Sequence, residues 1–198
     1  MSTNRLEAFS DGVIAVAITL LALDIAVPEP NGTHSLGHAL LQQWPNYVAY
    51  AISFITIGII WINHHVMIGR LREADHSIFI LNLLLLMSIG VLPFATALMA
   101  RYLREGNGEH LAAAVYAGAF LVLSLAFISL QRQILLRRPR LLKAELPEAE
   151  RRRIVRRTAT GLVPYALALA LAPVSPYVTL AICAAVAGFY ALPIASSA

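Results

Sequence analysis

Long apolar runs alternate with short polar segments along this chain, and most of the runs are long enough to cross a lipid bilayer. The runs occupy residues 47–69, 77–100 and 111–131, and a first one extends from about residue 4 to residue 27, where VPEPNG ends it. The last charge-free stretch divides at APVSPY into residues 158–172 and 177–193. Because about 20 apolar residues cross the hydrocarbon core as a helix, the pattern predicts an all-α bundle of six transmembrane helices in one domain, residues 1–198.

The composition supports this interpretation. Hydrophobic residues make up 59% of the chain and charged residues only 13%, with a mean hydropathy of +0.70. Soluble domains carry roughly a quarter charged residues. We therefore expect a multi-pass protein of the cell membrane, with much of its surface in contact with lipid.

Basic residues are concentrated between the fourth and fifth predicted spans. Residues 132–157 hold ten of the 15 Lys and Arg residues, and with this segment in the cytoplasm only Arg101 and Arg104 lie outside. Short loops rich in Lys and Arg stay on the cytoplasmic side, so both termini are expected to be cytoplasmic. A patch for nucleic acid or acidic lipid is the alternative. We interpret the segment as a basic cytoplasmic linker with surface-helix character and expect no nucleic-acid partner.

The first span, RLEAFSDGVIAVAITLLALDI, carries charged side chains inside an apolar run. Ionisable groups in membrane helices are costly, so they usually face other helices and pair there. Steps of three and four residues define one narrow face of this helix, with Ser10 and Asp11 on other faces. That narrow face consists of Arg5, Phe9, Gly12, Val16, Leu20, Leu23 and Val27.

Candidate partners for Asp11 lie at a similar depth in the second and third spans. They are Trp61, Asn63, His64, His65 and Asn82. The positions predict a buried polar network that joins the first three spans. Two other interpretations of this cluster remain open. His64 and His65 would form part of a metal site, or Asp11 and His64 would relay protons in a secondary transporter. Adjacent residues on a helix point about 100° apart and no further ligands have zinc spacing, so we expect no metal.

The segment RLEAFSDGV, with Arg5, Phe9, Ser10 and Asp11, resembles the R-x-x-x-F-S-D signature of the transmembrane protein 175 family of potassium-permeable channels. The resemblance extends through IIWINHHVM in the second span and LNLLLLMSIGVLPF in the third, about the first half of the chain. It implies a homotetramer of six-helix subunits whose first helix lines a central pore.

The resemblance also implies roles for particular residues. Val16, Leu20 and Leu23 would form the apolar constriction, with Thr19 beside it, while Ser10 and Asp11 would tie the first helix to the next two. The full implied network is Arg5, Phe9, Ser10, Asp11, Trp61, His64, His65 and Asn82. The helix projection instead places Arg5 and Phe9 on the pore-facing side.

The chain contains no T-V-G-Y-G segment, the carbonyl filter of many potassium channels. The sequence therefore predicts passive K⁺ conduction with moderate selectivity through an apolar constriction, no cofactor and no enzymatic activity. A proton-coupled secondary transporter using Asp11 and His64 is the alternative. Asp24, at the outer end of the first span, would either concentrate cations or pair with Arg101 or Arg104.

Overall fold

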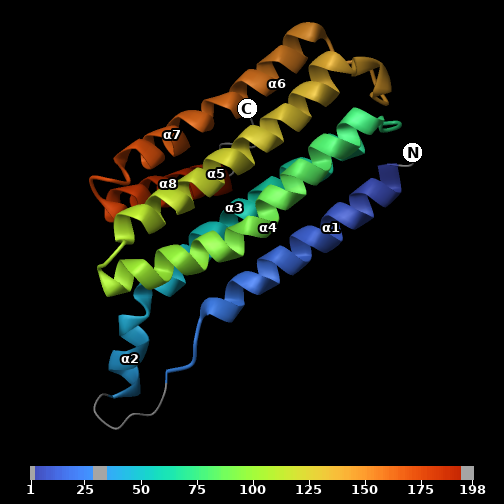
Figure 1. Ribbon diagram of the computed structural model, residues 1–198. Helices are drawn as coiled ribbons and strands as arrows, with labels where there is room; N and C mark the ends of the chain where they lie inside the picture. The colour runs from blue at the N-terminus through green and yellow to red at the C-terminus, as the bar shows by residue number, and fades with distance from the viewer. Residues whose placement is uncertain (1–2, 29–34, 193–198) are drawn as a thin grey trace.

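The computed structural model describes residues 3–28 and 35–192, which form helices joined by short connections (Figure 1). The α-helices are α1 (Thr3–Leu20), α2 (Leu36–Gln42), α3 (Trp44–Gly69), α4 (His76–Glu105), α5 (Glu109–Arg132), α6 (Glu148–Thr160), α7 (Leu162–Leu171) and α8 (Pro176–Ala191). Three short helical turns complete the chain: the 3-10 turn η1 (Leu21–Asp24), the π-turn η2 (Gln133–Arg137) and the 3-10 turn η3 (Pro139–Leu141).

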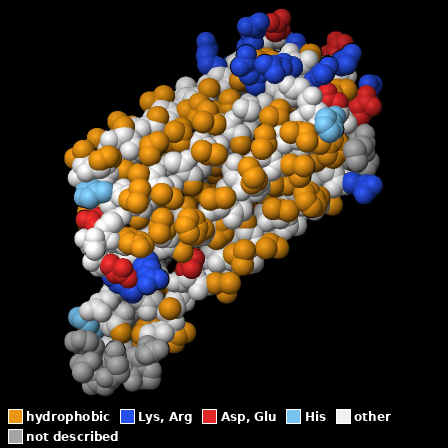
Figure 2. Space-filling model, viewed as in Figure 1, with side chains coloured by type: hydrophobic (Ala, Val, Ile, Leu, Met, Phe, Trp, Pro, Cys, Tyr) orange, Lys and Arg blue, Asp and Glu red, His pale blue; other side chains and the backbone are white. Residues whose placement is uncertain are grey.

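The long helices run side by side, with α1 at one edge of the bundle beside α3 and α4, and α6 and α7 at the other (Figure 1). Five helical segments of the described chain are long and apolar enough to cross a membrane, and α8 is a shorter apolar helix. On the face drawn in Figure 2, hydrophobic side chains are spread over the surface between the two ends, while charged side chains gather near the ends. This is the all-helical membrane architecture that the hydrophobic pattern predicts, with one short addition, α2.

The first predicted span, 4–27, ends earlier in the structure. The α-helix stops at Leu20, and residues 21–24 tighten into η1. Asn46 on α3 donates from Nδ2 to the main-chain oxygen of Asp24 at 2.8 Å. The side-chain amide thus satisfies a carbonyl that a helix end leaves without a partner. Residue 193, the end of the last predicted span, lies outside the described residues.

The basic segment 132–157, which we expected to be a linker, is largely helical in the structure. The fourth span continues through the π-turn to Arg137, and a new helix begins at Glu148. Only Gly161 separates α6 from α7, so the fifth span, predicted as 158–172, belongs to a helical segment from Glu148 to Leu171. Arginine is a good helix former, and helix breaks here fall at Pro139 and Pro147.

Two connections are joined at the end where α6 begins. The loop after α3 and the loop after η3 exchange main-chain hydrogen bonds, Arg72 N to Leu141 O and Lys143 N to Arg70 O, both at 2.8 Å. Arg151 on α6 reaches back to the same region, donating from Nη1 to Leu135 O at 2.8 Å and from Nε to Leu146 O at 3.0 Å. The basic segment is therefore anchored to the ends of α3 and α5.

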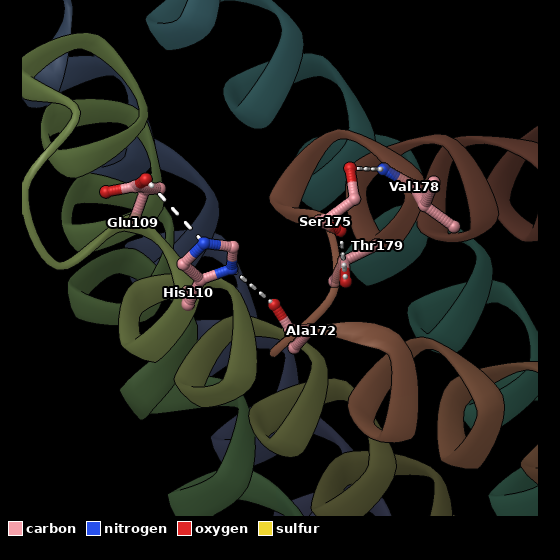
Figure 3. Close-up of polar contacts among 6 residues, drawn as sticks. All are labelled: Glu109, His110, Ala172, Ser175, Val178 and Thr179. Carbon is pink, nitrogen blue, oxygen red and sulfur yellow. Dashed lines mark hydrogen bonds and ion pairs between the residues drawn. The ribbon is translucent and has the colours of Figure 1, made fainter.

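At the opposite end, α5 is held to the turn between α7 and α8 (Figure 3). His110 Nδ1 lies 3.0 Å from Ala172 O, so this nitrogen carries the proton and donates. Thr179 on α8 donates to Ala168 O on α7 at 3.0 Å. Ser175 begins α8 as its N-cap, accepting from Val178 N at 3.4 Å. The contact of His110 thus holds α5 to this turn, and the contact of Thr179 joins α8 to α7.

The anchoring by Arg151 leads to a first prediction. Arg151→Met should lower the free energy of unfolding by about 1–3 kcal/mol, because two carbonyls lose a charged donor. Arg152→Met is the matched control, since Arg152 is exposed and its ion pair within the described part of the chain is with Glu148, one helix turn away. Thermal unfolding in detergent measures both variants. Equal melting temperatures for the two would contradict the anchoring role.

Candidate functional site

A buried amide on α4 joins α1 to α3. Asn82 donates from Nδ2 to Ser10 Oγ at 2.9 Å, and its Oδ1 lies 2.7 Å from His64 Nε2. The side chains of all three residues are buried, with relative exposures of 0%. The sequence placed these residues in one network, and the structure brings them into contact.

The direction of each hydrogen bond in this group is determined. Oδ1 of Asn82 can only accept, so His64 carries a proton on Nε2. Nδ2 of Asn82 then donates to Ser10, whose hydroxyl donates in turn to Leu6 O at 2.8 Å within α1. His64 Nδ1 has no hydrogen-bond partner among the described residues. In a neutral ring this nitrogen is an acceptor, so the protonated nitrogen of His64 is the one that has a hydrogen-bond partner.

Two further contacts join α1 directly to α3, one helical turn apart. Trp61 Nε1 donates to Asp11 Oδ1 at 2.9 Å, and His65 Nδ1 lies 2.7 Å from Glu7 Oε1. Glu7 lies four residues before Asp11 on α1, and its partner lies four residues after Trp61 on α3. This opposite order is what two antiparallel helices require. Together with Asn82 they fix the rotation and the axial position of α1.

The structure corrects two expectations about this network. Asp11 is only partly buried and Trp61 is exposed, so their hydrogen bond lies at the surface of the single chain. Asn63 donates to Ile59 O within its own helix and does not join the network. Glu7 was not among the predicted site residues. Its four-residue spacing from Asp11, matched by the spacing of His65 and Trp61, was the available signal.

The opposite face of α1 is exposed along its length. Val16 is 58% exposed, Leu20 43% and Leu23 76%. Arg5 and Phe9 lie on this side too, as the helix projection predicts, and they are separate from the polar contacts of Ser10 and Asp11. One side of α1 therefore packs on α3 and α4, while its other side presents apolar residues that need a partner or lipid.

Residues beside this face make local contacts. Thr19 donates to Val16 O at 2.8 Å, so its hydroxyl is used within the helix. Asp24 is partly buried, and Arg101, one of its two candidate partners, lies 3.1 Å from Glu105. Within residues 3–28 and 35–192, no group of three or more His, Cys, Asp or Glu residues is arranged to hold a metal ion.

The fold and the pattern of exposure define a multi-pass membrane protein. Residues 5–93 match the family model described as endosomal/lysosomal potassium channel TMEM175. A potassium channel of Streptomyces collinus is 46% identical over 90% of this chain and 86% of its own length. A potassium channel of Chamaesiphon minutus is 38% identical over 96% of this chain and 94% of its own length. The chain belongs to the TMEM175 family.

A solved structure gives the same result for the fold. The crystal structure of a lysosomal potassium-selective channel TMEM175 homolog from Chamaesiphon minutus superposes with a TM-score of 0.86 at 37% identity. The match covers 99% of this chain and 98% of the other. The agreement therefore includes α5 to α8, beyond the segment that the family model matches.

The buried amide leads to a second prediction. Asn82→Ala should lower the free energy of unfolding by roughly 2–5 kcal/mol, because His64 and Ser10 lose buried partners and a cavity is left. Asn63→Ala removes the same side chain from an exposed position of α3 and should cost less than about 1 kcal/mol. Thermal unfolding in detergent provides the comparison. If both variants melted alike, the amide would not hold α1 in place.

Proposed function

We propose that this protein forms a passive, potassium-permeable cation channel across the cell membrane. The family is one of ion channels, and the relatives described above are named potassium channels. The observation that carries the proposal is the exposed row Val16, Leu20 and Leu23 on a helix whose other side is held by paired polar groups. We propose neither a resident cofactor nor a catalytic role.

The channel is a homotetramer in this proposal, with the exposed face of α1 turned to the central axis. Among residues 3–28 and 35–192, no element of a single chain covers Val16, Leu20 and Leu23, so a closed pore needs symmetry-related copies. Three apolar rings, each made of four symmetry-related side chains, form a constriction that water leaves easily, which controls conduction by dewetting. Such rings offer no oxygen ligands, so selectivity for K⁺ over Na⁺ is moderate. Thr19 and Asp24 flank the constriction.

The orientation follows from charge. Lys and Arg side chains gather at the end of the bundle where α6 begins (Figure 2). This end is cytoplasmic in the proposal, together with the start of α1 and the C-terminus, because Lys and Arg near membrane spans remain on that side. Glu7 and Asp11 then lie near the cytoplasmic entrance and Asp24 near the outer one.

The geometry favours a channel over a proton-coupled transporter based on Asp11 and His64. Asp11 accepts from Trp61, whereas His64 bonds Asn82, so the two groups have separate partners. In this proposal both side chains act as scaffold that orients α1.

Recording from purified protein in planar bilayers tests the function. With KCl on one side and NaCl on the other, we expect unitary currents and a reversal potential that favours K⁺ moderately, since no carbonyl filter is present. The control is protein with Asn82→Ala, which should yield fewer active channels of unchanged conductance. Absence of unitary currents, together with transport that depends on a pH gradient, would support a transporter.

Substitution on α1 tests which face lines the ion path. Leu20→Asn should raise conductance roughly twofold or more, because a polar ring removes the dewetting barrier. The matched control is Leu21→Asn, the same change at a side chain that is 1% exposed, which should reduce folded yield instead.

Thiol accessibility gives an independent measurement of the same face. In a Cys183→Ala background, Leu20→Cys should react with small water-soluble thiol reagents and lose current, whereas Leu21→Cys should not. The background substitution removes the native thiol, which is buried. Equal protection of both cysteines in conducting channels would show that α1 does not line the path.

A further inference from the structure

A basic pocket lies beside the first turn of α4, away from the exposed face of α1. Its volume is ≈ 540 Å³, and its walls come from α4 and from the segment that follows α5. His76, Ser77 and Ile80 form one wall, and Gln133, Arg137 and Arg138 form the other. The pocket therefore combines cationic, hydrogen-bonding and apolar side chains.

Two arginines give the pocket its charge. Arg138 is held by Asp75, the N-cap of α4, with 2.9 Å between Nε and Oδ2. This pair fixes the guanidinium at the pocket wall. Arg137 is exposed, and it makes no ion pair with any residue of the described segments. With one carboxylate against two guanidinium groups, the pocket keeps a positive charge that complements a phosphate.

The pocket opens onto an apolar stripe that continues along α4. Ile80 lines the pocket and is exposed, and steps of four and three residues lead from it along the same side of the helix. The stripe consists of the exposed side chains Ile80, Leu84, Met87, Val91 and Phe94. A ligand with a phosphate and a long hydrocarbon chain would match both the charge and the stripe.

The position of the pocket matches the boundary of a membrane. With 30 residues, α4 is about 45 Å long, whereas the hydrocarbon core is about 30 Å thick. The first turn of α4 therefore reaches the level of the lipid headgroups, while the stripe lies at the level of the acyl chains. A free phosphate ion would use only the cationic part of this surface.

We propose that this pocket is a binding site for an anionic phospholipid. The lipid phosphate lies between Arg137 and Arg138, the glycerol backbone meets the polar side chains of His76 and Ser77, and one acyl chain follows the stripe on α4. The site is independent of the ion path, since none of its lining residues belongs to α1. Basic pockets between membrane helices commonly hold acidic headgroups.

Native mass spectrometry of delipidated full-length protein in a neutral detergent tests the site, with palmitoyl-oleoyl phosphatidylglycerol as the probe. We expect one tightly held lipid per subunit and weaker binding of the phosphatidylcholine with the same chains. Arg137→Gln should weaken phosphatidylglycerol binding about tenfold, because a charged hydrogen bond is lost. Arg137→Lys, which keeps the charge, should retain most of the affinity.

The matched control is Arg156→Gln, which removes the same charge from an exposed position of α6. It should change affinity less than about twofold, as expected for a solvent-screened charge that does not line the pocket. Equal weakening by Arg137→Gln and Arg156→Gln would overturn the proposal in favour of diffuse attraction. Equal affinity for the two lipids would also overturn it. Displacement of the lipid by millimolar inorganic phosphate would indicate a simple anion site instead.

Discussion

The arrangement of the helices depends on hydrogen bonds among a few polar side chains that are buried away from the surface. Asn82, Ser10 and His64 are fully buried among apolar helices, and each hydrogen bond that they form would be costly to lose there. Because the amide of Asn82 bonds to both neighbours at once, α1 has one favourable rotation relative to α3 and α4. That rotation decides which side chains of α1 are exposed.

The two sides of α1 thus have different physical roles. Small and medium apolar side chains such as Ile14 and Ala17 pack against the subunit, and the polar contacts near Ser10 set the angle. The exposed side presents apolar side chains such as Val16 and Leu20 that are not packed against other helices of the single chain. In the proposed tetramer, packing inside each subunit sets the geometry of a pore that no subunit contains by itself.

Much of the fold was predictable because hydrophobic length and helix periodicity act locally. The long spans and the face containing Val16 and Leu20 follow from spacing alone. Helix ends were harder to predict, because they depend on residues that are distant in the sequence. Asn46 donates to the main chain of Asp24 where the first span ends, and Arg151 holds the basic segment by donating to the main chain of Leu135. In the polar site, the residue types indicated contact between Ser10, His64 and Asn82. The sequence alone did not show that Glu7 pairs with His65. His64 and His65 are neighbours on α3, and only the rotation of the helix decides which of the two faces Glu7.

The π-turn at the end of α5 has a consequence for the direction of the arginines at its end. The turn over Gln133–Arg137 is wider than an α-helical turn, so each residue in it rotates less about the helix axis. The residues that follow are therefore rotated by roughly a quarter turn from the positions they would have in a continuous α-helix. In this phase Arg137 and Arg138 line the pocket beside the first turn of α4. Loss of a single residue from the turn would restore the α-helix and leave both guanidinium groups near their present side, because five residues of the wider turn cover nearly the same angle as four α-helical residues. The π-turn therefore lets the chain carry one additional residue here without changing the side on which the two arginines lie.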